Sequence, residues 1–95
     1  MSAGDAILLD GADDVATVLR AISSGETVSV TGPSGDVQVV AKEAIPIFHK
    51  IAIKPLLPGT DVFKYGEPIG TVVTAVGKGA LVHTHNLRSK RAAEA

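Results

Sequence analysis

Three copies of one short pattern constrain this 95-residue chain more than any other feature. Each copy has an aliphatic residue, two variable residues, a glycine, two further variable residues and a valine, and the glycines are Gly25, Gly59 and Gly79. A glycine relieves the backbone of a tight turn, so the flanking aliphatic residues can point into one core. The spacing between copies is unequal, which excludes a solenoid of fixed period. The pattern predicts a compact β structure made of repeated turn-and-strand units.

Short apolar runs between Gly, Pro and Asp residues extend this expectation to the whole chain. Two alternating runs separated by turn residues at 31–36 predict a hairpin. The strands expected from such runs are residues 7–9, 27–30, 37–40, 47–53, 61–64, 69–74 and 80–85. Residues 14–22 instead carry apolar residues at helical spacing behind Asp13, a typical N-cap residue, and predict one helix. The expected fold is mainly β, with many short strands and one short helix.

Composition excludes several classes of function. A formal net charge of −1 gives no basic field, so nucleic acid is not expected as a partner. The chain has no cysteine, and no apolar run reaches the roughly 20 residues of a membrane span or resembles a secretory leader. We expect one cytoplasmic domain over residues 1–95. Because 45% of its residues are hydrophobic, some apolar surface should remain for self-association or partner docking.

Two of the three histidines lie in "ALVHTHNL", residues 80–87. Alternate residues of a strand project from the same face, so His83 and His85 are expected to point together while Val82 enters the core. Two imidazoles on one face can bind a divalent ion or a carboxylate, and Asn86 adds an amide beside them. The alternative is surface decoration, because two histidines do not complete a metal site. Both interpretations stay open at this stage.

Other polar residues are weaker candidates. His49 is a possible third ligand, but the favoured interpretation is a half-buried histidine satisfied by the backbone, because Lys50 beside it takes the polar face. A second group surrounds a glycine and could supply an acid or a base, although such a run is more often only a turn. This group consists of Lys64, Tyr65 and Glu67.

Four segments, taken in order, carry a resemblance to a known family. They are residues 14–20, "HKIAI" within 43–53, "KYGEPIG" within 62–70 and "VHTHN" within 79–87. Together they resemble the N-terminal domain of the altronate and galactarate dehydratases over residues 5–88. The resemblance implies a SAF-type β-clip fold, and it leaves residues 89–95 as a frayed tail.

The resemblance also implies an activity. In many members this domain is fused to a large region that removes water from a sugar acid with iron or another divalent metal. That region is absent here, so we expect a natural small subunit of a two-component dehydratase, although a chain trimmed at a domain boundary would end similarly. Split relatives include the sulfolactate sulfo-lyases, which eliminate sulfite. The alternatives are thus a small sulfo-lyase subunit, or a module that binds a sugar acid or docks a protein without chemistry.

Elimination next to a carboxylate needs a base, stabilisation of the developing charge and help for the leaving group. A divalent ion, iron or manganese, can supply the last two. A domain this small cannot enclose a polyol acid alone, so it is expected to form one wall of a site shared with a large catalytic subunit and to be inactive alone. The expected catalytic residues are His83, His85 and Asn86, with His83 and His85 as metal ligands. The expected substrate-binding residues are His49, Lys50, Lys64, Tyr65 and Glu67.

Overall fold

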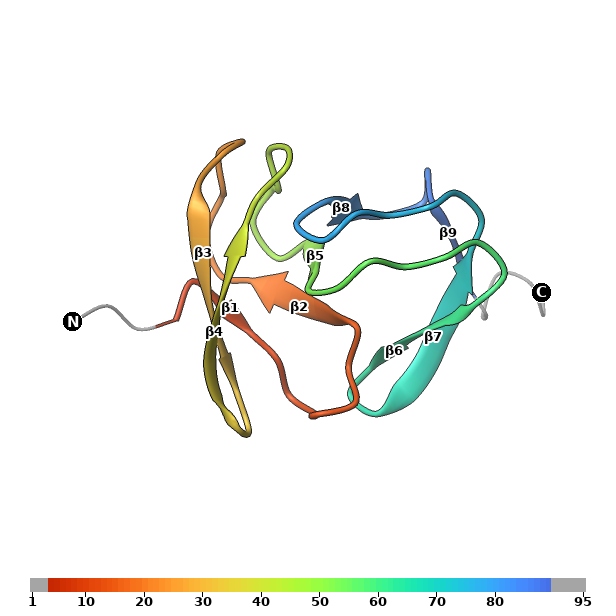
Figure 1. The fold of residues 1–95 in the computed structure, drawn as a ribbon, viewed down its shortest axis with the longest axis horizontal. Coiled ribbons are helices and arrows are strands. Elements are labelled where there is room, and N and C mark those ends of the chain that lie inside the picture. Colours follow the sequence, from red (N-terminus) through yellow and green to blue (C-terminus); the bar gives the residue numbers. More distant parts are fainter. Residues whose placement is uncertain (1–3, 90–95) are drawn as a thin grey trace.

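The computed structural model describes residues 4–89, and regular secondary structure in this part of the chain is entirely β-strand (Figure 1). The strands are β1 (Ala6–Ile7), β2 (Val15–Val18), β3 (Thr27–Gly32), β4 (Gly35–Val40), β5 (Lys50–Ala52), β6 (Asp61–Lys64), β7 (Glu67–Val72), β8 (Leu81–Val82) and β9 (Leu87–Ser89). The described residues include no helix long and apolar enough to cross a membrane. The expectation of a mainly β fold with many short strands is confirmed.

The strands of residues 4–89 form two sheets. The larger has the strand order β4-β3-β1-β2-β5-β8, and the smaller has the order β6-β7-β9. Neighbouring strands are antiparallel except for β1 and β3, which are parallel. In Figure 1 the β3–β4 hairpin stands at one end of the molecule and the β6–β7 hairpin at the other. The strands β2, β5 and β8 lie between these two ends.

The side chains of β2 and β5 divide the interior into two apolar cores. Ala16 and Ile51 pair across these strands and pack in the core beside the β3–β4 hairpin. Val15 and Ala52 pair one residue further along and enter the second core, beside β6 and β7. Because successive side chains of a strand point to opposite faces, these central strands are covered on both sides.

This double burial explains why the helix expected over residues 14–22 is wrong. A strand buried on both faces carries a nearly continuous apolar run, which periodicity alone cannot distinguish from a short helix. The region contains β2 instead, followed by bends. Leu19, which helical spacing would place inside, is 46% exposed. Asp13 caps no helix, because the strand β2 follows it. Its carboxylate instead accepts hydrogen bonds from the backbone amides of Tyr65 and Gly66.

The glycine pattern found in the sequence is a recurring turn of the fold. Gly25, Gly59 and Gly79 have φ angles of 86°, 86° and 91°, in the left-handed region that favours glycine. The valines three residues further on are buried: Val28, Val62 and Val82. The aliphatic residues three positions before the glycines form isolated β-bridges: Ile22 with Ile45, and Leu56 with Val76.

The bridge partner of Ile22 shows that the turn occurs a fourth time. Ile45 begins this copy, buried Ile51 ends it, and Phe48 stands in the glycine position with a φ of 67°. Two copies joined by a β-bridge bind each other in the same way: the amide at the glycine position of one copy donates a hydrogen bond to the carbonyl that lies four residues before the bridge residue of the other. The bonds run from Gly25 N to Ala41 O, Phe48 N to Val18 O, Gly59 N to Val72 O and Gly79 N to Ala52 O, with lengths of 2.8–2.9 Å. The fourth copy escapes the sequence pattern because an aromatic residue replaces the glycine.

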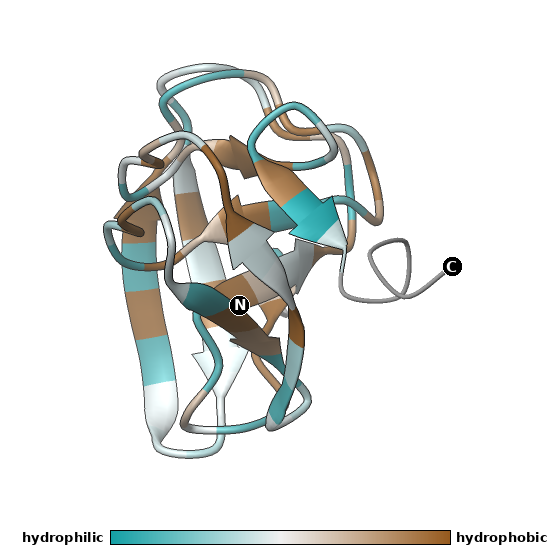
Figure 2. Ribbon diagram, turned by 90° about the vertical axis from the view of Figure 1, so that its right-hand side faces the viewer, coloured by the Kyte–Doolittle hydropathy of each residue, from teal (hydrophilic) through white to brown (hydrophobic). Residues whose placement is uncertain are grey.

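Strand boundaries agree with expectation in the β3–β4 hairpin and in β6, and differ elsewhere. The strand expected over residues 47–53 is reduced to β5, because residues 47 and 48 form a turn, and β7 begins and ends two residues earlier than the expected 69–74. The β3–β4 hairpin and β6 are confirmed, and hydrophobic and hydrophilic residues alternate along the hairpin (Figure 2). The strand expected over residues 80–85 is wrong beyond Val82, where β8 ends and a turn begins. Sequence reasoning also missed β9, which pairs with β7. Of the tail expected at residues 89–95, all but Ser89 lie outside the described residues.

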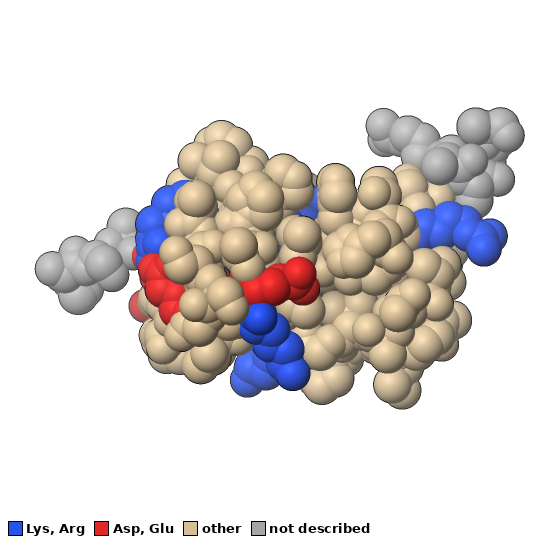
Figure 3. Space-filling view, turned by 90° about the horizontal axis from the view of Figure 1, so that it is seen from above, with Lys and Arg blue, Asp and Glu red and all other residues tan. Residues whose placement is uncertain are grey.

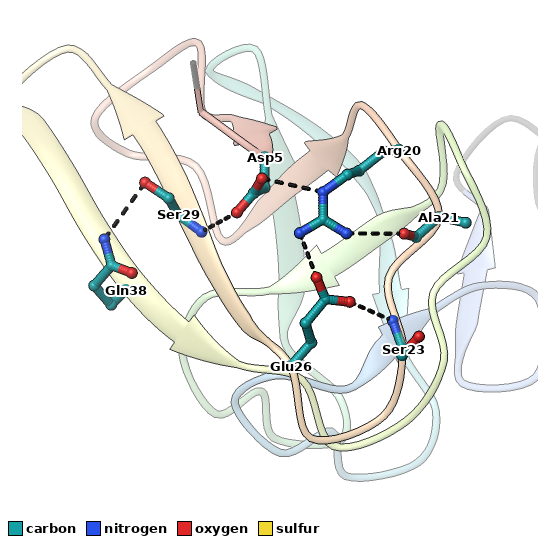
Figure 4. A network of polar contacts seen from close by, with 7 residues as sticks. All are labelled: Asp5, Arg20, Ala21, Ser23, Glu26, Ser29 and Gln38. Atoms are coloured by element: carbon teal, nitrogen blue, oxygen red, sulfur yellow. Dashed lines mark hydrogen bonds and ion pairs between the residues drawn. The ribbon is translucent and has the colours of Figure 1, made fainter. Parts of the chain in front are cut away.

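A polar network fastens β1, the segment after β2, and the start of β3 (Figure 4). The guanidinium of Arg20 forms ion pairs with Asp5 and Glu26. The same Asp5 carboxylate accepts a 3.0 Å hydrogen bond from Ser29 N, and Glu26 accepts one of 2.8 Å from Ser23 N. Asp5 has a lowered pKa, chiefly because of the hydrogen bond from Ser29 and also through Arg20, against the opposing effect of burial.

Candidate functional site

The antiparallel pairing of β5 with β8 brings two of the three histidines together. Lys50 pairs with Val82 in this ladder, and the same register continued by one residue sets His49 opposite His83. The centroids of the two imidazole rings are 5.0 Å apart, and their planes are inclined by 57°. The Nδ1 atom of His49 lies 3.1 Å from the carbonyl oxygen of Ile47. A contact between residues 34 positions apart thus follows from strand pairing.

The turn after β8 separates His83 from His85. The amides of Asn86 and Leu87 both donate to the carbonyl of His83, so the chain reverses where an extended strand was expected. The premise that the two histidines project from one strand face is therefore wrong. His85 is exposed, and its Nε2 atom lies 3.2 Å from Asn86 Nδ2.

Asn86 holds this turn from inside. Its side chain accepts a 2.9 Å hydrogen bond from His83 N and donates one of 2.8 Å to Leu81 O. The residue is only 6% exposed. Both ends of the amide are thus satisfied by the backbone, and the side chain fixes the direction in which His83 leaves the strand.

A pocket of about 340 Å³ opens beside His83. Strands from both sheets contribute to its wall: β5, β6, β7 and β9, together with the turn after β8. The lining residues are Lys50, Lys64, Tyr65, Ile69, His83, Thr84, Leu87 and Ser89. Four of the predicted site residues line this one pocket. His49 does not line it but contacts the ring of His83, which does. His85, Asn86 and Glu67 do not line it.

The pocket is cationic: among residues 4–89, its lining includes two lysines and no acidic side chain. Burial of the half-buried Lys50 lowers the pKa of its ammonium group, and the positive charge of Lys64 lowers it further, while Tyr65 acts in the opposite direction. Lys64 Nζ lies 4.5 Å from the centroid of the Tyr65 ring, in a cation–π contact. Within residues 4–89, the ion pairs that the structure contains involve Arg20 and Lys54 and neither pocket lysine.

The Tyr65 turn owes its position to a residue that sequence reasoning assigned elsewhere. Tyr65 and Gly66 form the two-residue loop between β6 and β7, with φ angles of 57° and 74°. Such a loop needs positive φ at both positions and favours Asn-Gly, so a tyrosine there is unusual. The buried carboxylate of Asp13 accepts 2.8 Å hydrogen bonds from both loop amides. An aspartate beside a predicted helix gave no local signal for this long-range role.

The described residues do not by themselves fit a metal centre. Within the range 4–89, no three His, Cys, Asp or Glu side chains lie close enough together to hold an ion. The neighbouring imidazoles of His49 and His83 could supply at most two ligands to a metal ion, whereas a protein-bound metal usually has three or four protein ligands. Glu67, which could have added a carboxylate, lies exposed on β7 opposite Lys64.

Charge is mixed over the face of the molecule that is seen from above in Figure 3. On the face seen in Figure 3, lysine and arginine side chains form separate groups among uncharged residues, with acidic groups beside some of them. This face has no continuous basic patch of the kind that binds a nucleic-acid backbone.

Comparison with known proteins identifies similar chains. The family model described as the altronate/galactarate dehydratase SAF domain matches residues 4–90. The (2R)-sulfolactate sulfo-lyase subunit alpha of Paracoccus pantotrophus is 47% identical over 62 residues, which are 65% of this chain and 92% of that protein. The protein of the same name from Chromohalobacter salexigens is 36% identical over 90 residues, or 92% of this chain and 96% of the relative.

A longer protein shares the same domain. Altronate dehydratase of Escherichia coli strain K12 is 32% identical over 83 residues. The matched part is 87% of this chain but only 16% of the dehydratase. The same sequence pattern thus accounts for nearly all of two short proteins and for a small part of a much larger one.

Proposed function

We propose, because the chain belongs to the altronate/galactarate dehydratase SAF domain family, that it is the small subunit of a two-component lyase acting on a hydroxy carboxylic acid. The observation that carries this proposal is one of length. The chain covers 92% and 96% of two relatives that are each named a subunit alpha, but 16% of altronate dehydratase. A large catalytic subunit would supply the remainder of the active site.

The same observation orders the candidate reactions. Both relatives that the match covers almost completely are named for sulfolactate sulfo-lyase, so we place elimination of sulfite from a 2-hydroxy acid first. The family description and the similarity to altronate dehydratase support elimination of water from a sugar acid as the second candidate. Both reactions remove a proton beside a carboxylate and expel a group from the neighbouring carbon.

The pocket lined by Lys50, Lys64 and His83 would be the wall that the small chain contributes. Its ammonium groups would bind the anionic groups of the acid, and the imidazole of His83 would be the general base among the lining groups. A divalent metal, iron or manganese, remains part of the proposed assembled site. Since residues 4–89 lack a full ligand set, the large subunit would have to provide the others.

The proposal is tested by reconstitution. The chain, a candidate large lyase subunit from the same organism, and their mixture are assayed for sulfite release from sulfolactate and for 2-oxo acid formation from altronate and galactarate. We expect turnover only by the mixture, with sulfolactate as substrate. Turnover by this chain alone would overturn its assignment as a small subunit. Turnover by the mixture on altronate or galactarate alone would replace the first reaction by the second.

A further inference from the structure

We infer that three exposed apolar residues, Leu19, Ile47 and Phe48, form a docking surface for the large lyase subunit, with Phe48 as its anchor. This surface is the Phe48 patch. The identity of the partner rests on the proposed function, which the inference deepens, because it names the face of the small chain that the partner covers. That face lies beside His49, one residue from Phe48 along the chain.

The backbone at Phe48 gives the first argument. The other three copies of the turn have glycine at this position, whereas Phe48 adopts a φ of 67° with a full side chain. A left-handed backbone is unfavourable for a residue with a Cβ atom. The side chain is 67% exposed, so packing within the chain does little to compensate for the strain. Strained residues of this kind cluster at functional sites.

The residue before Phe48 departs from the other copies in the same way. Ile47 is 46% exposed, and the corresponding residues of the other three turns are Ser24, Pro58 and Lys78. The fourth turn therefore presents two consecutive large apolar side chains to solvent, and neither is needed to form this type of turn. Aromatic and apolar residues grouped on a surface are typical of the centre of a protein–protein interface.

Hydrogen bonds hold the two segments of the Phe48 patch side by side. The amides of Ile22 and Ile45 each donate to the other's carbonyl, with lengths of 2.9 Å. Further along the same two segments, the amide of Phe48 donates to Val18 O at 2.9 Å. Leu19, which is 46% exposed, lies between these contacts and adds the third apolar side chain. A surface that is formed before binding loses little freedom on docking, which favours affinity.

The position of the patch identifies its occupant as the large subunit. His49 follows Phe48 directly, and its ring contacts that of His83, which lines the pocket. Residues 4–89 do not supply a full metal-ligand set, so a chain that completes the proposed site has to approach His83 and thereby comes close to the patch. In altronate dehydratase of Escherichia coli the matched domain is 16% of the protein, and the remainder of such a chain could cover the same face.

The test measures binding of the 95-residue chain to the candidate large lyase subunit from the same organism by isothermal titration calorimetry, without turnover. The variants are Phe48→Gly and Phe48→Asn, because glycine and asparagine both tolerate a left-handed backbone. Each should weaken binding roughly thirtyfold, the usual effect of truncating an anchor residue. Phe48→Gly should also resist urea better than the wild type. A residue that served only the fold would not combine higher stability with weaker binding.

Leu57→Ala is the matched control, because Leu57 is 66% exposed and belongs to the third turn, and it should change affinity less than about threefold. Wild-type affinity in both Phe48 variants, or an equal loss in Leu57→Ala, would overturn the inference and leave the proposed subunit role intact. Self-association of the wild type that Phe48→Gly abolishes, with large-chain binding unchanged, would assign the patch to a second copy and also overturn it. Absence of binding by the wild type would overturn the proposed function itself, together with the inference.

Discussion

The buried carboxylate of Asp13 accepts a 2.8 Å hydrogen bond from the backbone amide of Tyr65, across 52 residues of the chain. Its second oxygen accepts an equal bond from Gly66. These contacts fix a turn whose first residue has the positive φ that an aromatic side chain rarely adopts. Because Tyr65 lines the pocket from this turn and Lys64 lines it from the end of β6 directly before, Asp13 is a positioning residue for the candidate site.

Replacing Asp13 should therefore destabilise the fold. Asp13→Ala leaves two backbone donors without their acceptor, and we expect a loss of about 2–3 kcal/mol in the free energy of unfolding. Urea denaturation followed by circular dichroism measures the change. Asp36→Ala is the matched control, because Asp36 is exposed on β4, and it should stay within about 0.5 kcal/mol of the wild type. A similarly small effect of Asp13→Ala would contradict the anchoring role.

The two histidines of the "HTH" stretch should differ in function. His83 lines the pocket and touches His49, whereas His85 does neither. We expect His83→Ala to lower turnover of the reconstituted complex by roughly a hundredfold, the usual size of a lost acid–base contribution. Because both side chains are exposed, each variant should unfold within about 0.5 kcal/mol of the wild type. An equal loss of turnover in His85→Ala would place the site elsewhere.

The fourth turn should become more stable when it receives the glycine found in the other three. Phe48 has a φ of 67° and is 67% exposed, so little packing offsets its backbone strain. Phe48→Gly is expected to raise the free energy of unfolding by about 0.5–1 kcal/mol. Gly59→Ala is the mirror-image control: it also has positive φ and open space around it, and it should lower stability by about 1 kcal/mol. Urea denaturation of both variants checks the opposite signs.

Acid should destabilise the protein partly through Asp5. Its pKa is lowered in the folded state, mainly by the hydrogen bond from Ser29, from an ordinary value of 3.8. The resulting stabilisation is fully present above the unfolded-state pKa and is lost as the pH falls through the lower folded-state pKa. Stability measured by urea denaturation at several pH values should thus fall less steeply below about pH 5 in Asp5→Asn than in the wild type. Equal slopes would show that other carboxylates dominate.

The local sequence was sufficient to predict several turns, one hairpin and some residues of the candidate site. Three of the four turns were found because glycine is the residue that a left-handed backbone requires, and the β3–β4 hairpin because its turn residues separate two alternating runs. The polar runs at residues 49–50, 64–65 and 83 were likewise recognised as candidates, and four of these residues line one pocket. Each of these signals lies within a few consecutive residues.

Only the tertiary structure decided how these pieces meet. β2 is a strand because both of its faces are covered by distant residues, which its local apolar spacing cannot reveal. His83 and His85 separate because Asn86 draws the chain into a turn, and His83 meets His49 because β8 pairs with β5. The fourth turn and the Asp13–Tyr65 contact depend in the same way on partners far along the chain. Long-range burial and pairing outweigh local preference there, because the free energy of a strand comes mainly from its neighbours.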